Sequence, residues 1–150
     1  MIHKEERISF NDILYIWQKY LWPGRESPIK SHSAMTLNGS ISMEIYNYPA
    51  THWGIYHNNK IIAVNSGHMS SKNHYRSRGL WVHEQFRKKG LAQLLLSATT
   101  LQAKKEGCSV IWSIPRKEAL PTYKASGFTE EGNYFATETS TANIYATKLL

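Results

Sequence analysis

The segment from residue 80 to residue 114 constrains the fold most, because its hydrophobic pattern changes period twice. Residues 80–82 and Val110–Ile114 are short apolar runs, which is typical of buried strands. Between them, residues 88–106 carry apolar side chains at helical spacing, and Gly107 follows as a C-cap. Two strands joined by a helix form a βαβ unit, so we expect a parallel pair with a right-handed crossover. The expected apolar face of the helix consists of Leu91, Leu94, Leu95, Ala98 and Leu101.

The rest of the chain predicts mostly antiparallel strands around this unit. A helix near Asn11–Leu21 comes first, and Ser9 with Asp12 supplies a capping box for it. Asn58-Asn59 has the composition of a tight hairpin turn. The whole pattern predicts an α/β fold with one mixed sheet, in a single domain over residues 1–150. The further expected elements are strands at 41–48, 52–57, 61–69, 75–82, 128–135 and 143–149, and a short helix at 118–126.

Composition limits the class of protein. With 41% apolar and 19% charged residues, the 150-residue chain is expected to fold as a globular domain. Cys108 is the single cysteine, so we expect neither an intramolecular disulfide nor a metal site. The polar start Met1–Arg7, and the lack of an apolar stretch of about 18–20 residues, predict a cytoplasmic protein with no membrane partner.

The net charge of +7 is concentrated in one region of the chain. Residues 72–124 hold eleven lysines and arginines against three acidic residues, so the remainder is close to neutral. A charge of this kind favours a polyanionic partner, which is a nucleic acid, an acidic membrane or a phosphorylated small molecule.

The basic region contains a predicted phosphate site at the start of the long helix. A helix N-terminus offers unpaired backbone N–H groups and the positive end of the helix dipole. Gly90 lets a ligand approach the backbone, and Ala92 keeps the next turn small. The adjacent cations are Arg87, Lys88 and Lys89.

Two motifs in this half of the chain resemble those of the GCN5-related N-acetyltransferase (GNAT) superfamily. The run Arg87-Lys88-Lys89-Gly90-Leu91-Ala92, after a strand that ends in Val82, resembles motif A, Arg/Gln-x-x-Gly-x-Gly/Ala. Ala119, Tyr123, Gly127 and Phe128 stand as in motif B, Ala-x-x-x-Tyr-x-x-x-Gly-Phe. The motif resemblance covers residues 75–130, and the order of elements agrees over the rest.

The resemblance implies a GNAT-like fold of about six or seven strands, mostly antiparallel, with a central splayed parallel pair and flanking helices. It also implies acetyl transfer from acetyl-CoA to an amine, without a metal. Backbone groups of the strand end would hold the thioester and pantetheine, and those of the loop the pyrophosphate. The residues implied in cofactor binding are Leu80, Trp81, Val82, Arg87, Lys88, Lys89, Gly90, Leu91 and Ala92.

Tyr123 matches the residue that acts as general acid in the family, near the sulfur of the leaving CoA. A phenol with a pKa of about 10 is protonated at neutral pH and can donate its proton. The alternative is a core tyrosine that packs the short helix against the sheet.

The general base stays open. Family members often have a glutamate on the strand before motif A, but that strand carries no carboxylate here. The candidates are His74, His68, Glu44 or a chain of water molecules. Arg116 stands where many members have an asparagine that contacts pantetheine.

The acceptor is expected to be a small-molecule amine or a peptide amine, and the loop with Trp22 and Arg25 is a candidate for its binding, with Arg25 able to bind an acceptor carboxylate. A homodimer is left open.

One alternative function is a GNAT-like domain that binds acyl-CoA without catalysis. Another is a nucleic-acid-binding domain, which is less favoured because Trp81 and Trp112 lie in apolar runs that predict burial.

Overall fold

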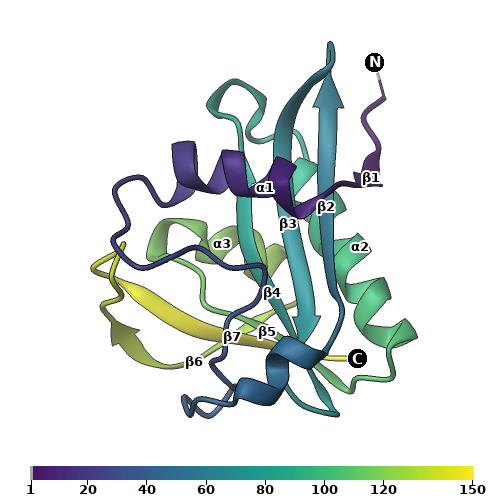
Figure 1. The fold of residues 1–150 in the computed structure, drawn as a ribbon. Coiled ribbons are helices and arrows are strands. Elements are labelled where there is room, and N and C mark those ends of the chain that lie inside the picture. Colours follow the sequence, from purple (N-terminus) through teal and green to yellow (C-terminus); the bar gives the residue numbers. More distant parts are fainter. Residues whose placement is uncertain (1) are drawn as a thin grey trace.

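Residues 2–150, which the computed structural model describes, form one mixed sheet of seven strands in the order β1-β2-β3-β4-β5-β7-β6 (Figure 1). Within these residues β4 and β5 form the parallel pair, and the other neighbours are antiparallel. The predicted mixed α/β fold is therefore confirmed. The strands are β1 (Glu5–Arg7), β2 (Ala50–His57), β3 (Lys60–Met69), β4 (His74–Val82), β5 (Val110–Ser113), β6 (Thr129–Phe135) and β7 (Asn143–Leu149).

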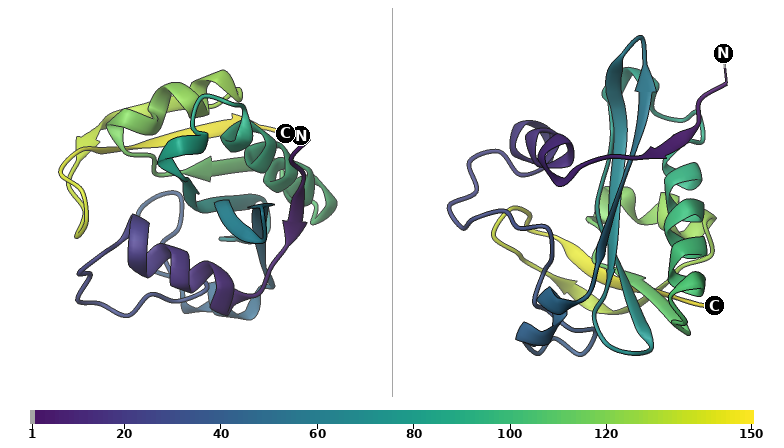
Figure 2. Two further views of the ribbon diagram at one scale, coloured as in Figure 1. Left: turned by 90° about the horizontal axis from the view of Figure 1, so that it is seen from above. Right: turned by 45° about the vertical axis from the view of Figure 1, so that its right-hand side comes forward.

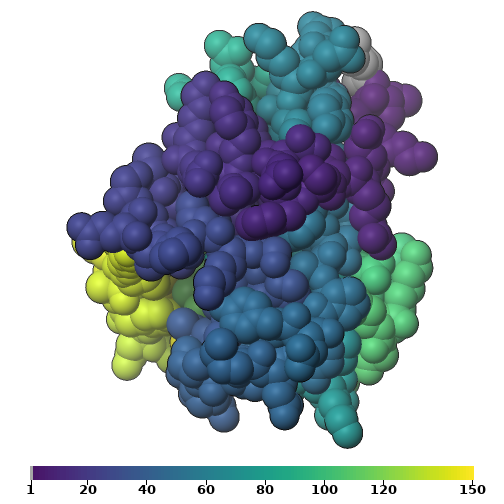
Figure 3. All heavy atoms as spheres, viewed as in Figure 1, coloured from purple at the N-terminus to yellow at the C-terminus, as the bar shows by residue number. Residues whose placement is uncertain are grey.

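Helices cover both faces of the sheet, with α1 (Phe10–Ile16) on one face and α2 (Leu91–Lys105) and α3 (Leu120–Ala125) on the other (Figure 2). α1 continues into a π-helical turn, Trp17–Leu21. α1 and the chain that follows it cover much of the face seen in Figure 3. Among the described residues, no helix combines the length and apolar character needed to cross a lipid bilayer.

Two local predictions are confirmed. The Ser9 Oγ accepts a hydrogen bond from the Asp12 backbone N–H at 3.1 Å, which caps α1. Asn58 and Asn59 have φ values of 50° and 65°, as a two-residue hairpin turn between β2 and β3 requires. Both features depend on short stretches of sequence, so they could be predicted without knowledge of the tertiary structure.

The predicted strand at 41–48 is wrong, because Met43–Asn47 forms a 3₁₀-helix. Ile45 is fully buried, whereas Met43 is 67% exposed, so the alternating apolar residues do not share one buried face. The edge strand next to β2 is instead β1, which pairs with Trp53–Ile55.

The predicted apolar face of the long helix is only partly right, and the helix starts later than expected. Leu91 and Leu95 are buried, whereas Leu94 and Ala98 are only half-buried, and Leu96, outside the predicted face, is buried as well. Leu101 is 55% exposed, whereas Thr99 is fully buried. The Thr99 Oγ1 accepts a hydrogen bond from the Asn65 side chain at 2.9 Å and donates one to the Leu95 carbonyl at 2.8 Å. A polar residue satisfied inside the core has no signal in a hydrophobic pattern. The helix starts at Leu91 because Gly90 has a φ of 81°.

A bulge in β4 separates this strand from β5. Arg78 pairs with Ser66 and Trp81 with Val64, so two residues of β4 lie opposite one residue of β3. Gly79, within the bulge, has a φ of 80°, and its carbonyl accepts a hydrogen bond from the Trp17 indole at 2.9 Å. The pairing with β5 covers His74–Arg76 only, so the parallel strands splay beyond it, as predicted.

The segment between α1 and β2 is held on the sheet by a buried histidine. His68 is fully buried, its Nδ1–H donates to the Met69 carbonyl at 2.9 Å, and its Nε2 accepts from the Ser33 backbone N–H at 3.3 Å. These bonds need a neutral imidazole, and burial lowers the pKa of His68 to about 3. Burial, with the charges of His32 and Arg78, also lowers the pKa of His52 to about 4.

Gly79→Ala should destabilise the fold by about 2–4 kcal/mol. A Cβ atom at this position would lie 2.4 Å from the Trp17 indole, and the positive φ would add backbone strain. The free energy of unfolding from urea titration measures the effect. The control is Gly24→Ala, which has a φ of 72° and open space around a Cβ, so it should cost about 1 kcal/mol. Equal losses for the two variants would contradict the role assigned to the Trp17 contact.

Acid should destabilise the fold through the buried histidines. In the unfolded chain a histidine takes up a proton near pH 6.5, whereas the folded-state pKa of His68 is about 3. Below pH 6.5 protonation therefore favours the unfolded chain, and the free energy of unfolding falls as the pH falls. For His68 the loss is about 2 kcal/mol at pH 5, since one pKa unit corresponds to about 1.4 kcal/mol. Urea titrations between pH 5 and pH 8 measure it. His68→Asn should flatten this dependence, and an unchanged slope would disprove the assignment.

Candidate active site

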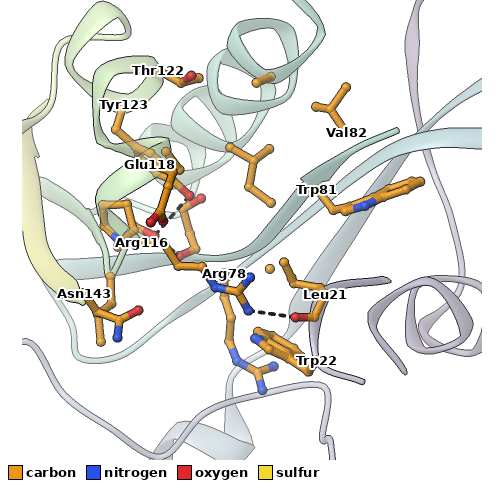
Figure 4. Close-up of a pocket in the computed structure, with 18 of the residues that line it drawn as sticks. Leu21, Trp22, Arg78, Trp81, Val82, Arg116, Glu118, Thr122, Tyr123 and Asn143 are labelled. Carbon is orange, nitrogen blue, oxygen red and sulfur yellow. Dashed lines mark hydrogen bonds between the residues drawn. The ribbon is translucent and has the colours of Figure 1, made fainter. Parts of the chain in front are cut away.

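The splay of β4 and β5 opens a cavity of about 820 Å³ that reaches both faces of the sheet. Thr122 and Tyr123 of α3 line it from one side, and Leu21 and Trp22 line it from the other (Figure 4). Ser113, at the end of β5, lies on its wall. The gap between the strands therefore joins the two layers of the molecule in one continuous space.

The loop before α2 forms one end of the cavity. Lys88 and Gly90 have φ values of 61° and 81°, and a Cβ at Gly90 would have no atom within 4 Å. Within the described residues no side chain caps α2, whose first internal hydrogen bond is from the Leu94 N–H to the Gly90 carbonyl at 3.0 Å. The N–H groups of its first turn are thus free to bind an anion.

Five of the six residues predicted in this loop line the cavity, and their positive charge surrounds the helix start. Arg87 is oriented by a hydrogen bond from its Nε to the Val82 carbonyl at 3.0 Å. Lys89 is the residue outside the cavity lining, and its ammonium lies 5.6 Å from the centre of the Phe86 ring. The residues that line the cavity here are Arg87, Lys88, Gly90, Leu91 and Ala92.

The end of β4 forms the adjoining wall, and Leu80, Trp81 and Val82 all line the cavity. Beyond the bulge, the edge of β4 that faces β5 has no strand partner, since the ladder between them stops at Arg76. Trp81 is 8% exposed, and its ring stacks on that of Tyr20 with 4.7 Å between the ring centres. An extended ligand with amide groups can therefore bind along this strand edge.

Tyr123 lies in the gap between the strands. It is 4% exposed, and its hydroxyl oxygen is 3.4 Å from the Ser113 Oγ. The Ser113 hydroxyl donates its proton to the Ser77 carbonyl at 2.8 Å, and 3.4 Å is long for a hydrogen bond between two hydroxyl oxygens, so no strong bond holds the Tyr123 proton. Burial raises the pKa of Tyr123, which keeps the phenol neutral and able to donate.

The candidates for a general base lie away from this cavity. His68 is buried against Ser33 and Met69, and Glu44 is exposed on the 3₁₀-helix. His74 stands at the start of β4, at the end of the strand away from the splayed part, and none of the three lines the cavity.

The carboxylates that do line the cavity are Glu118 and Glu138. Glu138 accepts hydrogen bonds from the Ser27 Oγ at 2.6 Å and the Ser27 N–H at 3.1 Å, and lies 3.4 Å from the Arg25 Nε. Sequence reasoning missed Glu138, because no local motif marks a residue brought to the site from the connection between β6 and β7.

Arginines line the end of the cavity away from the start of α2. Arg116 donates to the Leu21 carbonyl at 2.7 Å, so it links the two sides of the cavity (Figure 4). Arg76 and Arg78 of β4 line the same end. The sequence shows these charges but not their burial.

Other ligand classes find less support in the described part of the chain. No cluster of three or more histidine, cysteine, aspartate or glutamate residues in residues 2–150 is arranged to hold a metal ion. Trp112 is fully buried, and Trp81 nearly so, which leaves these rings covered rather than available for stacking on nucleic-acid bases.

Solved structures share this fold over the full length of the chain. An IAA acetyltransferase from Bacillus cereus ATCC 14579 matches with a TM-score of 0.71 at 16% identity, covering 99% of this chain and 100% of that one. Ard1 from Thermoplasma volcanium matches with a TM-score of 0.69 at 16% identity, covering 100% and 99%. A GNAT family acetyltransferase from Elizabethkingia anophelis, solved with acetyl-CoA bound, matches with a TM-score of 0.62 at 16% identity, covering 99% and 98%.

The sequence itself matches a known family. No curated protein matches the chain at a significant level. Residues 14–128, however, match the acetyltransferase (GNAT) family, and this range includes the βαβ unit, the loop before α2 and Tyr123. The chain therefore belongs to the GNAT family of acetyltransferases.

Proposed function

We propose that the chain is an N-acetyltransferase that moves the acetyl group of acetyl-CoA to a primary amine by direct attack within a ternary complex. The observation that carries this proposal is the continuous cavity, which connects an open helix N-terminus to a buried, protonated Tyr123. The acetyl-CoA found in the Elizabethkingia anophelis structure of the same fold supports it.

The loop before α2 fits the phosphates of acetyl-CoA. The free N–H groups at the start of α2 would bind the pyrophosphate, with Arg87 and Lys88 neutralising its charge. The unpaired edge of β4 at Leu80–Val82 would bind the amide groups of pantetheine as an added strand does. Acetyl-CoA supplies the activated acetyl thioester. Lys89 remains a predicted contact from the sequence alone.

Tyr123 serves as the proposed general acid. The amine nitrogen forms a bond to the acetyl carbonyl carbon, the bond from that carbon to sulfur breaks, and Tyr123 gives its proton to the departing thiolate. The tyrosinate that results takes a proton from solvent. Burial, which raises the pKa of Tyr123, favours this return to the neutral phenol.

Water is the proposed acceptor of the proton that the amine must lose. His74, His68 and Glu44 do not line the cavity, and Glu138 is engaged by Ser27 and Arg25. The positive lining lowers the pKa of a bound ammonium, since like charges disfavour the protonated form, and so helps to form the neutral nucleophile.

Three sequence predictions concern the protein beyond its site. They are a single domain over residues 1–150, a cytoplasmic location and the open question of whether the chain forms a homodimer. Each stays a prediction, as does the choice between a small-molecule amine and a peptide amine as acceptor.

CoA should raise the melting temperature of the protein, and Gly90→Val should weaken CoA binding at least about tenfold, because a side chain would fill the approach to the helix start. Thermal shift and calorimetric titration measure both effects. Gly132→Val is the matched control, since Gly132 also has a positive φ and open space around a Cβ.

A shift with an oligonucleotide but not with CoA would favour the nucleic-acid-binding alternative and overturn the proposal. A CoA shift without thiol release for any amine would favour an acyl-CoA-binding domain without catalysis.

Tyr123→Phe should lower kcat roughly hundredfold, because the departing thiolate loses its proton donor. CoA affinity should change less than about twofold, because a general acid acts in the transition state and adds little to the binding of CoA. Release of free CoA thiol measures the rate. Tyr15→Phe is the control, because that hydroxyl is exposed on α1, accepts a hydrogen bond from Lys19 and does not line the cavity. A Tyr123→Phe enzyme with the wild-type rate would rule out the acid role and leave Tyr123 as a packing residue.

A further inference from the structure

Two arginines on β4 face the end of the cavity where the acceptor would bind. Arg76 and Arg78 are two positions apart on the strand, so their side chains share the face covered by α1. The Arg76 guanidinium lies 4.9 Å from the centre of the Trp112 ring. That of Arg78 lies 5.0 Å from Trp17 and 5.1 Å from Trp22. Aromatic rings thus hold both groups in place.

The hydrogen-bonding groups of these arginines are largely unused. The Nε and Nη1 atoms of Arg76 are buried and have no hydrogen-bond partner within residues 2–150. Arg78 is 6% exposed, and its side chain makes one bond there, from Nη1 to the Lys30 carbonyl at 2.8 Å. Neither takes part in an ion pair within the same residues. Buried N–H groups of a cation are costly without an acceptor, so this site is built to receive one.

The charge of the cavity lining is predominantly positive. Burial and mutual repulsion lower the pKa of Arg78 to about 9, and burial lowers that of Arg76 to about 10, so both stay charged at pH 7. A simple ammonium ion is repelled by such a lining, whereas an anion is attracted. The lining holds the carboxylates Glu118 and Glu138 and the cations Arg25, Arg76, Arg78, Arg87, Lys88 and Arg116.

Arg25, the residue that the sequence suggested for an acceptor carboxylate, already has partners. Its Nε donates to the Ser27 Oγ at 2.8 Å and lies 3.4 Å from Glu138. Arg116 uses one Nη on the Leu21 carbonyl. The buried N–H donors without an acceptor therefore belong to Arg76, next to the gap that holds Tyr123.

We infer that the acceptor is an amine that also carries a carboxylate, and that Arg76 and Arg78 bind this carboxylate. The inference rests on the proposed acetyl transfer and names its substrate class. A planar guanidinium matches a carboxylate through paired N–H groups, which a single ammonium does not do. Arg76 lies where β4 last pairs with β5, so an amine that reaches the gap is only a few bonds from its carboxylate. Small amino acids have this spacing.

The first test compares matched acceptors on the wild-type protein. The twenty L-amino acids are assayed for CoA thiol release beside their carboxamides, which keep the amine but lose the negative charge. At least one amino acid should exceed its carboxamide about tenfold or more in kcat/KM. Carboxamides that react as well as, or better than, every free acid would overturn the inference.

A second arm separates carboxylate from phosphate, because guanidinium groups bind both. β-Alanine and O-phosphoethanolamine place a carboxylate and a phosphate at similar distances from a primary amine. A preference for phosphoethanolamine over β-alanine and over every amino acid would overturn the assignment to a carboxylate.

Variants locate the effect in the protein. Arg76→Gln should raise KM for the preferred amino acid at least about tenfold, while its carboxamide and the affinity for CoA change little. Arg76→Lys, which keeps the charge, should recover part of the loss. Lys104→Gln removes the same charge from the exposed C-terminal turn of α2 and is the control. Equal effects on acid and carboxamide in Arg76→Gln would contradict the assignment.

Binding measurements separate this inference from the proposed function. The preferred amino acid should raise the melting temperature of the wild-type protein with CoA present, and Arg76→Gln should abolish that rise. Such protection without thiol release would support the carboxylate site and refute the catalytic proposal. Thiol release with carboxamides at the same rate as with free acids would support the catalytic proposal and refute the carboxylate site.

Discussion

The contact between the Trp17 indole and the backbone of Gly79 is the constraint on which the site depends. Trp17 donates a hydrogen bond to the Gly79 carbonyl and fills the space in which a side chain at residue 79 would lie. Glycine is therefore required, and its positive φ produces the bulge in β4. β4 stays paired with β3 but leaves β5, so a buried tryptophan on one face fixes a gap in the middle of the sheet.

The gap brings together groups from both layers of the fold. Tyr123 reaches it from α3, and the open N-terminus of α2 lies at one end of the same cavity. The other end is closed by the chain that follows α1, which Arg78 and His68 hold through hydrogen bonds to the backbone of Lys30 and Ser33. This side of the cavity is thus tied to the sheet by buried hydrogen bonds, which require a neutral His68 and a charged Arg78.

The excess positive charge of residues 72–124 divides into groups with different surroundings. Arg87 and Lys88 stand at the start of α2, where a phosphate would bind. Lys104 and Lys105 lie exposed in the last turn of α2, where their charges interact favourably with the negative end of the helix dipole. Arg76 and Arg78 line the cavity, where they pack against aromatic rings and form no ion pair with any carboxylate of residues 2–150.

The sequence by itself determined the features that depend on neighbouring residues. The cap at Ser9 and the Asn58-Asn59 turn are decided by backbone geometry over a few residues. The βαβ unit follows from the change of hydrophobic period between residues 80 and 114. Only the tertiary structure decided which face of each segment is buried. Tertiary contacts make Met43–Asn47 a 3₁₀-helix, expose Leu101 and bury Thr99 in a polar network. They also bury the Nε and Nη1 atoms of Arg76 without a hydrogen-bond acceptor among residues 2–150. The reason is that burial and pairing depend on segments far apart in the chain, whose approach a hydrophobic pattern does not record.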